Sequence, residues 1–182
     1  MATWRADPLH WGHGPRVFDM FLEPTCPHSA RAFGKLGDLL AQAGEDRVTV
    51  RLWLHSQPWH MYSGVVTRTV VAASTLEGGK ESARRVLAAV AAHRDEYEFD
   101  QHCAGPNLTA TPNDIIARLE GHSGLGLARP FAIPDLDREI KRHCKFSRQN
   151  GIHVSPTFMI DGLVQPDIGS RDAVSEWIAR IG

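Results

Sequence analysis

The chain of 182 residues has only three cysteines, no long apolar run and no excess of charge of one sign. The N-terminus shows no basic segment followed by an apolar stretch, so we expect no secretory signal, a cytoplasmic protein and no structural disulfide framework. No stretch reaches the roughly 18 apolar residues that a transmembrane helix needs, so we expect no membrane association. The net charge of −1 gives no support to nucleic-acid binding.

Several nucleotide and hydrolase signatures are also missing. There is no glycine-rich phosphate loop and no Gly-x-Ser-x-Gly elbow, so neither nucleotide binding nor serine hydrolysis is indicated. Hydrophobic residues make up 42% and charged residues 23% of the chain, which is typical of a folded globular domain. The sequence contains no internal repeat and is long enough for one domain with a substantial core.

The first part of the chain predicts a strand, a helix and a second strand. The apolar run Val17–Leu22 indicates a strand buried on both faces. Apolar positions at helical spacing follow from about Ser29 to Ala43, and Gly44 suits the end of that helix. Val48–Leu54 alternates with period two and predicts the second strand. Strand, helix and strand in so few residues form a βαβ unit, whose strands we expect to be parallel.

The middle of the chain predicts mainly helices. Residues 65–73 suit a helix, although their β-branched side chains would also suit a strand, and residues 82–93 indicate a second helix. Thr111, followed by Pro112 and by Asp114 at the third helical position, predicts a capped helix start, and we expect that helix to end at Gly121. A further helix is predicted over residues 135–150.

The last part of the chain returns to strands. Thr157–Ile160 and Leu163–Val164 flank Asp161-Gly162, a dipeptide typical of a tight hairpin. A final helix is predicted to begin at Ser170, with apolar side chains on one face. The order β-α-β, helices, β-β-α predicts an α/β fold whose single sheet is built from both ends of the chain. We therefore divide the chain into a core (residues 14–57 and 152–182), a helical insertion (58–151) and an irregular N-terminal segment (1–13).

Cys26 is the strongest candidate for chemistry. It lies between the first predicted strand and the following helix, and Pro27 suits the first helical turn. Unpaired backbone N–H groups and the helix dipole at this end stabilise a thiolate, and a protonated His28 would add positive charge nearby. The alternative from position alone is a buried cysteine that merely begins a helix.

Two motifs resemble those of the thioredoxin superfamily. Cys26-Pro27-His28-Ser29 resembles its active-site motif, and Val154-Ser155-Pro156-Thr157-Phe158 resembles its cis-proline loop. The helical insertion is similar to that of the DsbA-like branch, whose members exchange thiols and disulfides. The resemblance implies a thioredoxin-like fold, Cys26 as the attacking nucleophile, and Pro27 and His28 as the pair that tunes it. It also implies a cis bond before Pro156, with Ser155 facing the sulfur and the loop edge pairing with an extended substrate.

This chain departs from the family pattern at Ser29, where the family has its second motif cysteine. A two-cysteine enzyme attacks with one sulfur and releases the mixed disulfide with the other, so a dithiol cycle between positions 26 and 29 is excluded. We expect monothiol exchange or isomerase chemistry resolved by glutathione, by another protein, or by Cys103 or Cys144. Ser29 would still be able to donate a hydrogen bond to the thiolate.

The remaining cysteines and histidines carry weaker hypotheses. Cys144 is in row with Leu136 and Ile140, which predicts a buried, inert thiol on an apolar helix face. Cys103 lies in a polar stretch and is the better candidate for a resolving thiol. The ten histidines show no Cys-x-x-Cys or His-x-x-x-His spacing, so we expect no metal site and no tightly bound cofactor.

Three functions remain open from the sequence. The first is a thiol–disulfide oxidoreductase or disulfide isomerase that acts on protein or peptide thiols and disulfides, with glutathione as a co-substrate. The second is a glutathione-dependent transferase or isomerase of the kappa type, a related class that uses a hydroxyl where this chain has Cys26. The third is a peptide-binding module that has lost redox chemistry. Nothing in the pattern defines the oligomeric state.

Overall fold

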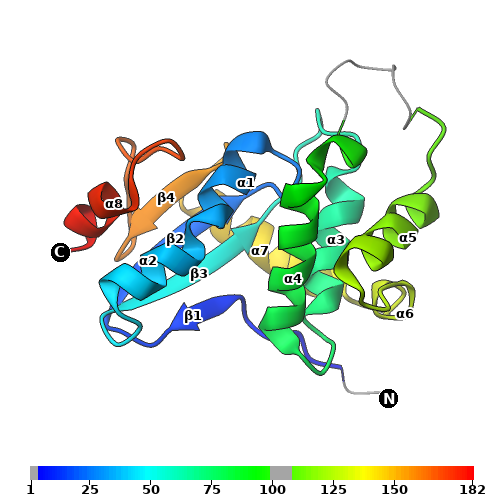
Figure 1. Ribbon diagram of the computed structural model, residues 1–182, viewed down its shortest axis with the longest axis horizontal. Coiled ribbons are helices and arrows are strands. Elements are labelled where there is room, and N and C mark those ends of the chain that lie inside the picture. Colours follow the sequence, from blue (N-terminus) through cyan, green and yellow to red (C-terminus); the bar gives the residue numbers. More distant parts are fainter. Residues whose placement is uncertain (1–3, 99–107) are drawn as a thin grey trace.

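A five-stranded mixed sheet runs through the molecule, with helices packed on both of its faces (Figure 1). The computed structural model describes residues 4–98 and 108–182. The strand order is β1-β3-β2-β4-β5, and only β2 and β3 are parallel, as the βαβ unit predicts. The strands are β1 (His10–Gly12), β2 (Arg16–Leu22), β3 (Val48–Leu54), β4 (Thr157–Ile160) and β5 (Leu163–Val164).

The helices follow the order that the sequence predicts: some between the first two long strands, a block in the middle of the chain, and one at its end. In the described residues they are α1 (Pro27–Gly34), α2 (Leu36–Ala43), α3 (Ser63–Ala73), α4 (Gly79–Ala92), the 3-10 helix η1 (Arg94–Glu96), α5 (Pro112–Ser123), α6 (Ala128–Phe131), α7 (Asp137–Gln149) and α8 (Val174–Ile181). Among these described helices, none has the length and apolarity needed to cross a membrane.

The two faces of the sheet bury different side chains. On β2, Phe18, Met20 and Leu22 point into the large core that includes α1, α2 and α8. Phe21 points to the opposite face, where it packs with Trp53 of β3 and Phe146 of α7. The alternation along β2 has the period of two that a strand imposes, and it explains why this strand is buried on both faces.

Several predicted element features are confirmed. Residues 65–73 lie in helix α3, so the tertiary packing resolves the helix-or-strand ambiguity in favour of the helix. Thr111 caps α5, with Pro112 at the first helical position and a reciprocal bond to Asp114. Asp161 and Gly162 both have positive φ, 47° and 86°, and connect β4 to β5. These are the conformations of the tight hairpin turn that the dipeptide favours.

The sequence led us to expect an irregular N-terminal segment, but part of this segment forms a strand. His10–Gly12 forms β1, an antiparallel edge strand that pairs with β3. Trp11 is buried, and its Nε1 donates to Glu81 Oε1 at 2.7 Å. Three residues are too few to show a periodic pattern, and the strand exists because the edge of β3 supplies its hydrogen-bond partners.

Three predicted helix boundaries are wrong. The helix over residues 29–43 is two helices, separated at Lys35, whose N–H bonds to Ala32 O and whose Nζ donates to Ser170 O at 2.8 Å. Helix α5 continues past Gly121 to Ser123, and its C-cap is Gly124, which has the left-handed φ of 66°. The last helix begins at Val174 rather than Ser170, because the preceding residues turn around hydrogen bonds to Asp172 and Gly169.

Candidate active site

Cys26 is the N-cap residue of α1, and Pro27 occupies the first turn as predicted. The Cys26 backbone N–H donates to Glu23 O at 3.1 Å, and its carbonyl accepts from Ala30 N at 2.9 Å. The residue is 7% exposed and is therefore buried, with only a small part of it accessible to solvent. Helix N–H groups without an intrahelical partner lie at this end, and they favour negative charge at the cap position.

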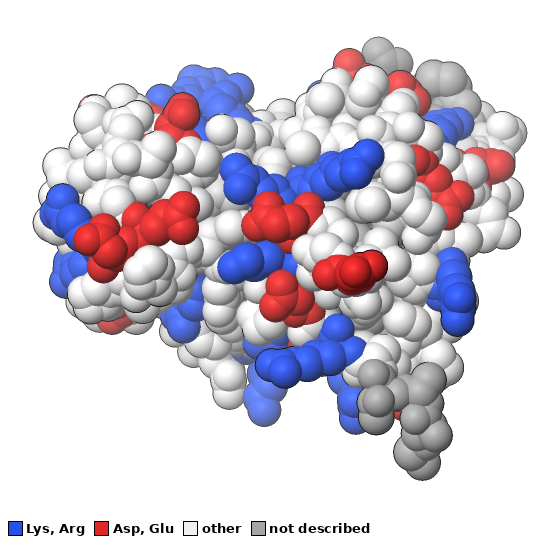
Figure 2. Space-filling model, turned by 60° about the horizontal axis from the view of Figure 1, so that its bottom comes forward, with Lys and Arg blue, Asp and Glu red and all other residues white. Residues whose placement is uncertain are grey.

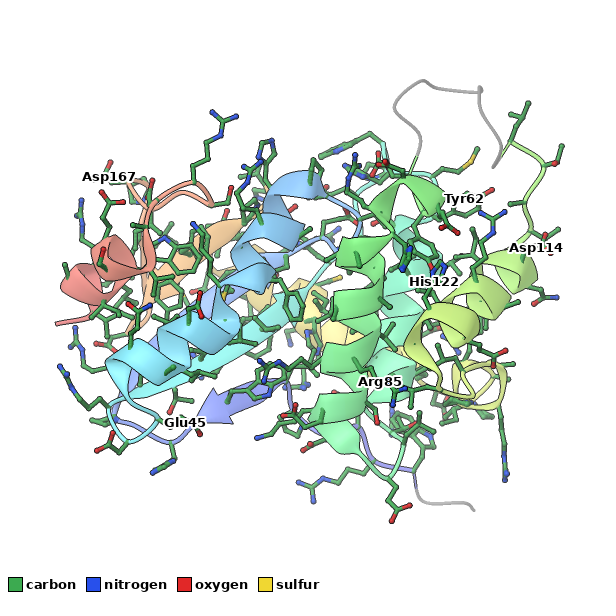
Figure 3. The ribbon with its side chains drawn as sticks, in the orientation of Figure 1. Glu45, Tyr62, Arg85, Asp114, His122 and Asp167 are labelled. Carbon is green, nitrogen blue, oxygen red and sulfur yellow. The ribbon has the colours of Figure 1, made fainter. Side chains whose placement is uncertain are left out.

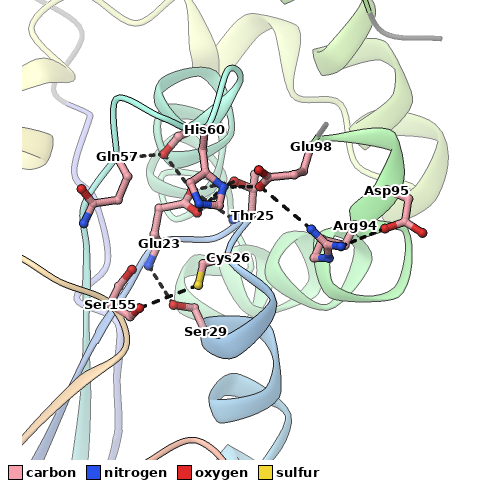
Figure 4. Close-up of polar contacts among 11 residues, drawn as sticks. Glu23, Thr25, Cys26, Ser29, Gln57, His60, Arg94, Asp95, Glu98 and Ser155 are labelled. Atoms are coloured by element: carbon pink, nitrogen blue, oxygen red, sulfur yellow. Dashed lines mark hydrogen bonds and ion pairs between the residues drawn. The ribbon is translucent and has the colours of Figure 1, made fainter. Parts of the chain in front are cut away.

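The sheet brings the second motif to the same place. The Ser155–Pro156 peptide bond is cis. Strands β2 and β4 are antiparallel neighbours, and Phe21 is paired with Thr157, so the turn after β2 meets the loop before β4. The Cys26 Sγ–H donates to the Ser155 carbonyl oxygen at 3.7 Å (Figure 4). The two halves of the motif, far apart in the sequence, therefore converge on one sulfur atom.

Ser29 has a structural partner of its own. The residue is 1% exposed, and its Oγ accepts the backbone N–H of Glu23 at 3.2 Å. The hydroxyl thus ties the first turn of α1 to the loop that precedes Cys26 (Figure 4). The expected hydrogen bond from Ser29 to the sulfur stays a prediction. His28 lies exposed on α1, with Nδ1 3.5 Å from Arg31 Nη1, so its tuning role also stays a prediction.

Sequence reasoning missed a buried carboxylate beside the cysteine. Glu23 is fully buried, and its Oε1 accepts from Thr25 N at 3.0 Å and from Ser63 Oγ at 2.7 Å. Thr25 Oγ1 lies 2.9 Å from both carboxylate oxygens and 3.1 Å from His60 Nδ1. The available signal was the acid three positions before Cys26, although nothing in the sequence indicated its partners. These bonds fix the loop that carries the cysteine.

A second carboxylate closes this polar cluster. Glu98 contacts His60 Nδ1, and Arg94 Nη1 lies 4.0 Å from Glu98 Oε2 (Figure 4). Burial raises the pKa of the Glu98 carboxyl, and the neighbouring His60 opposes that rise. Ligand atoms of Glu23, His60 and Glu98 lie within 4.8 Å of one another. Glu23 accepts from Thr25 and Ser63, and His60 contacts Glu98, so each of the three side chains already has a hydrogen-bond partner within the protein.

Exposed apolar side chains flank, in the sequence, two residues that lie near the cysteine, His60 and Ser155. Trp59 and Met61, on either side of His60, are 56% and 53% exposed. Val154, next to Ser155, is 64% exposed. Large apolar groups exposed around a polar centre are typical of surfaces that bind another chain.

The other cysteines are less well placed. Cys103 lies outside the described residues. Cys144 was predicted to be buried, but it is only half-buried. The side of α7 that faces the core carries His143 and Ser147, and Cys144 lies beside that side. Burial raises the pKa of the Cys144 thiol, which makes it a poor nucleophile at neutral pH.

Together, the sheet order, the cysteine at a helix N-terminus and the facing cis-proline loop define a thioredoxin-fold thiol protein. A scan against protein-family models gives no match, and neither does a search of curated proteins. Solved structures do match. A Pseudomonas syringae protein provisionally described as a protein-disulfide isomerase is 66% identical, with a TM-score of 0.94, over 97% of this chain and 98% of that one.

More distant structures share the fold. The thiol–disulfide exchange protein α-DsbA2 of Wolbachia pipientis is 15% identical, with a TM-score of 0.69, over 94% of this chain and 84% of that one. DsbA2 of Pseudomonas aeruginosa is 17% identical, with a TM-score of 0.62, over 98% and 97%. This chain belongs to the same family as the Pseudomonas syringae protein, a family of thioredoxin-fold enzymes described as protein-disulfide isomerases, and it shares its fold with the two DsbA2 proteins.

Proposed function

We propose that this protein carries out monothiol thiol–disulfide exchange on protein or peptide disulfides, with Cys26 as the nucleophile. The observation that carries the proposal is the position of Cys26 Sγ, at the N-terminus of α1 and 3.7 Å from the carbonyl that precedes cis-Pro156. The backbone at this helix end favours the thiolate, which is the attacking species. The exposed apolar side chains around it suit an extended peptide rather than a small polar molecule.

The exchange step balances without an internal second thiol. The Cys26 thiolate attacks one sulfur of a substrate R–S–S–R′, so that a Cys26–S–S–R bond forms as the substrate disulfide breaks. The departing R′–S⁻ takes up the proton that Cys26 has lost. Position 29 is a serine whose hydroxyl accepts from Glu23 N. Because a serine cannot attack the mixed disulfide as a thiol would, an external thiol has to release Cys26. Glutathione or a second cysteine of the substrate supplies that thiol and leaves Cys26 reduced.

The presence of a sulfur atom at position 26 favours exchange over the two alternative functions. A kappa-type transferase uses a hydroxyl at the position that Cys26 holds, and a hydroxyl cannot form the mixed disulfide. A redox-inactive peptide-binding module would not need a sulfur between the helix N-terminus and the cis-proline loop. We therefore propose that the surface around Trp59 and Val154 binds the peptide substrate of the exchange reaction, and that peptide binding is not a separate function.

The test compares three chains in an exchange assay with oxidised glutathione and with a disulfide-bonded peptide. Wild type and Cys144→Ser should form one adduct, seen by intact mass spectrometry, and should reduce the peptide catalytically with added glutathione. Cys26→Ala should form no adduct at the active site and should lose catalysis, while its circular dichroism stays native. Catalysis that persists in Cys26→Ala would overturn the proposal.

The alkylation rate of Cys26 separates exchange from the redox-inactive reading. An activated Cys26 should react with iodoacetamide at neutral pH faster than a free cysteine peptide does. A rate no faster than that of the peptide, together with peptide affinity, would favour the binding module.

A further inference from the structure

A small polar cavity lies between the loop after β3, the last turns of α7 and the residues that follow α7. Its volume is about 160 Å³. The side chains that matter for its chemistry are those of His55, Gln57, Cys144, Ser147, Arg148 and His153. Cys26 is not among its lining residues, so the cavity is separate from the turn that carries the nucleophile.

His55 places this cavity at the carboxyl ends of the two parallel strands. It follows β3 directly, and its backbone N–H donates to Leu22 O of β2 at 3.0 Å. Gln57 Nε2 donates to His153 O at 3.1 Å, which joins the loop after β3 to the segment that leads to Ser155. Open α/β sheets bind their ligands at the carboxyl ends of parallel strands. The cavity is therefore held in place at the edge of the sheet where such folds place ligands.

The imidazole of His55 has an unmet hydrogen-bonding group. The residue is 7% exposed, and its buried Nε2 has no hydrogen-bond partner among the residues that the structure describes. Burial, with a smaller contribution from His153, lowers the pKa of His55 to about 4. The ring is therefore neutral near pH 7, with one N–H and one lone pair to satisfy. Because buried polar groups in native proteins normally have a partner, this nitrogen indicates that a molecule bound in the cavity supplies it.

Arg148 gives the cavity its one permanent charge. Its side chain is exposed in the last turn of α7, and no carboxylate pairs with it in the described part of the chain. None of the residues that line the cavity is acidic. Cys144 adds no negative charge near pH 7, because burial raises the pKa of its thiol. One guanidinium among uncharged polar groups suits an anionic group with a single charge.

A carboxylate has the shape and charge that these side chains require. The fork of an arginine guanidinium matches the two oxygens of a carboxylate, and an N–H on His55 Nε2 matches one of them. A phosphate monoester carries up to two negative charges near pH 7, which one arginine does not balance. The cavity volume of about 160 Å³ equals about five waters of roughly 30 Å³ each. It therefore has room for an acid of a few carbon atoms.

We propose that this cavity binds the carboxylate group of a small organic acid, with Arg148 pairing with the carboxylate and His55 Nε2 donating to it. An Asp or Glu side chain of a bound peptide offers the same group. The proposal involves no step of thiol exchange, and Cys26→Ala should bind the carboxylate as wild type does. Residues 55–57 and 144–153 are far apart in the sequence, so no local pattern indicated this site.

The test is a titration of the full-length protein with sodium acetate, followed by ¹H–¹⁵N NMR, with sodium chloride at equal ionic strength as the reference. The amide signals of Gln57, Arg148 and His153 should shift saturably with acetate and not with chloride. Arg148→Gln should weaken acetate binding about tenfold, whereas Arg85→Gln should leave it unchanged. Arg85 is an exposed arginine of α4 that does not line the cavity, and its substitution removes the same charge (Figure 3).

His55→Phe tests the imidazole separately, because phenylalanine keeps a ring and removes the unpaired nitrogen. Acetate binding should weaken about tenfold while the NMR spectrum stays that of a folded protein. A purely structural role for His55 would lower the Tm without changing the affinity. Equal acetate binding in wild type and Arg148→Gln would overturn the proposal. Shifts that acetate and chloride produce alike would also overturn it, since a cavity filled by water alone gives that result.

A second titration separates the two sources of the carboxylate. It uses an N-acetylated, C-amidated peptide with a single Asp, and the same peptide with Asn in its place. Acetate that binds as tightly as the Asp peptide assigns the cavity to a free acid. An Asp peptide that binds more tightly than both acetate and the Asn peptide assigns it to an acidic side chain of a peptide.

Discussion

At the scale of single residues, the active-site turn depends on Ser29 as much as on Cys26. Position 29, where the resemblance to the thioredoxin superfamily implies a second cysteine, holds a serine whose oxygen accepts the Glu23 N–H at 3.2 Å. Glu23 in turn accepts from Thr25 and Ser63. The serine is thus part of the network that holds the Cys26 loop, and a sulfur at this position would be a weaker acceptor.

Ser29→Cys should change both stability and chemistry. We expect the reduced protein to lose about 1–3 kcal/mol of stability, because the buried Glu23 N–H loses a good acceptor. We also expect the mixed disulfide with glutathione to decay without added thiol, since the new cysteine can attack it. Ser175→Cys, which adds a thiol on the exposed side of α8, is the matched control. Mass spectrometry over time follows the adduct, and equal lifetimes in the two variants would contradict the expectation.

At the scale of elements, the start of α5 follows directly from its local sequence. Asp114 N donates to Thr111 Oγ1 at 3.3 Å, and Thr111 N donates to Asp114 Oδ2 at 2.7 Å. Pro112 fills the first helical position, where a missing N–H costs nothing. Helix α5 packs against α4, so its start also sets where these two helices meet.

Thr111→Ala should destabilise the protein by about 1 kcal/mol, the usual cost of losing an N-cap side chain. Thr111→Ser keeps the hydroxyl and should restore most of that loss. Asn113→Ala, one position from Asp114 and also exposed, is the control for general effects on helix propensity. Urea unfolding measures the free energy. A Thr111→Ala value equal to that of Asn113→Ala would show that the cap contributes nothing.

At the scale of the whole molecule, the sheet separates two cores of different character. One face is a large aliphatic and aromatic core, and the other is a small layer built from Phe21, Trp53 and Phe146. His143 sits under this second layer, and its Nδ1 accepts from Leu54 N at 3.0 Å. Burial lowers the pKa of His143 to about 3.

Figure 2 shows charges of both signs intermixed on the outer face it displays.

The buried histidine should make the fold sensitive to acid. The unfolded chain takes up a proton near pH 6.5, whereas folded His143 does so only near pH 3. Its contribution to stability is therefore complete above pH 6.5 and is lost as the pH falls toward 3, by about 1.4 kcal/mol per pH unit. His55, whose pKa burial lowers to about 4, adds a similar loss.

His143→Asn tests this dependence, because asparagine offers an acceptor near the same place and does not titrate. The free energy of unfolding, measured by urea between pH 6.5 and about pH 5, should fall less steeply in the variant than in wild type. The slope is the readout, since loss of the ring also lowers stability at every pH. Parallel slopes would show that His143 does not control the acid response.

The local sequence predicted the strands at 17–22 and 48–54, the cap at Thr111 and the hairpin at Asp161-Gly162. Each of these depends on side-chain periodicity or turn chemistry within a few residues, which a sequence displays directly. Helix ends were less predictable: Gly121 continues α5, because a glycine permits termination without requiring it. The prediction that Cys144 is buried was wrong. Its four-residue spacing from Ile140 and Leu136 places these side chains on one side of the helix, but it does not say whether that side or the adjacent one faces the core.

The sequence by itself determined the order of elements and the placement of Cys26 at a helix start, because both follow from local pattern. The tertiary structure alone decided which residues meet. It paired β1 with β3, brought Ser155 to the Cys26 sulfur, gathered Glu23, His60 and Glu98 around the turn, and set His93 beside His122. Such contacts join segments far apart in the chain, and their geometry arises from packing that no local sequence pattern encodes.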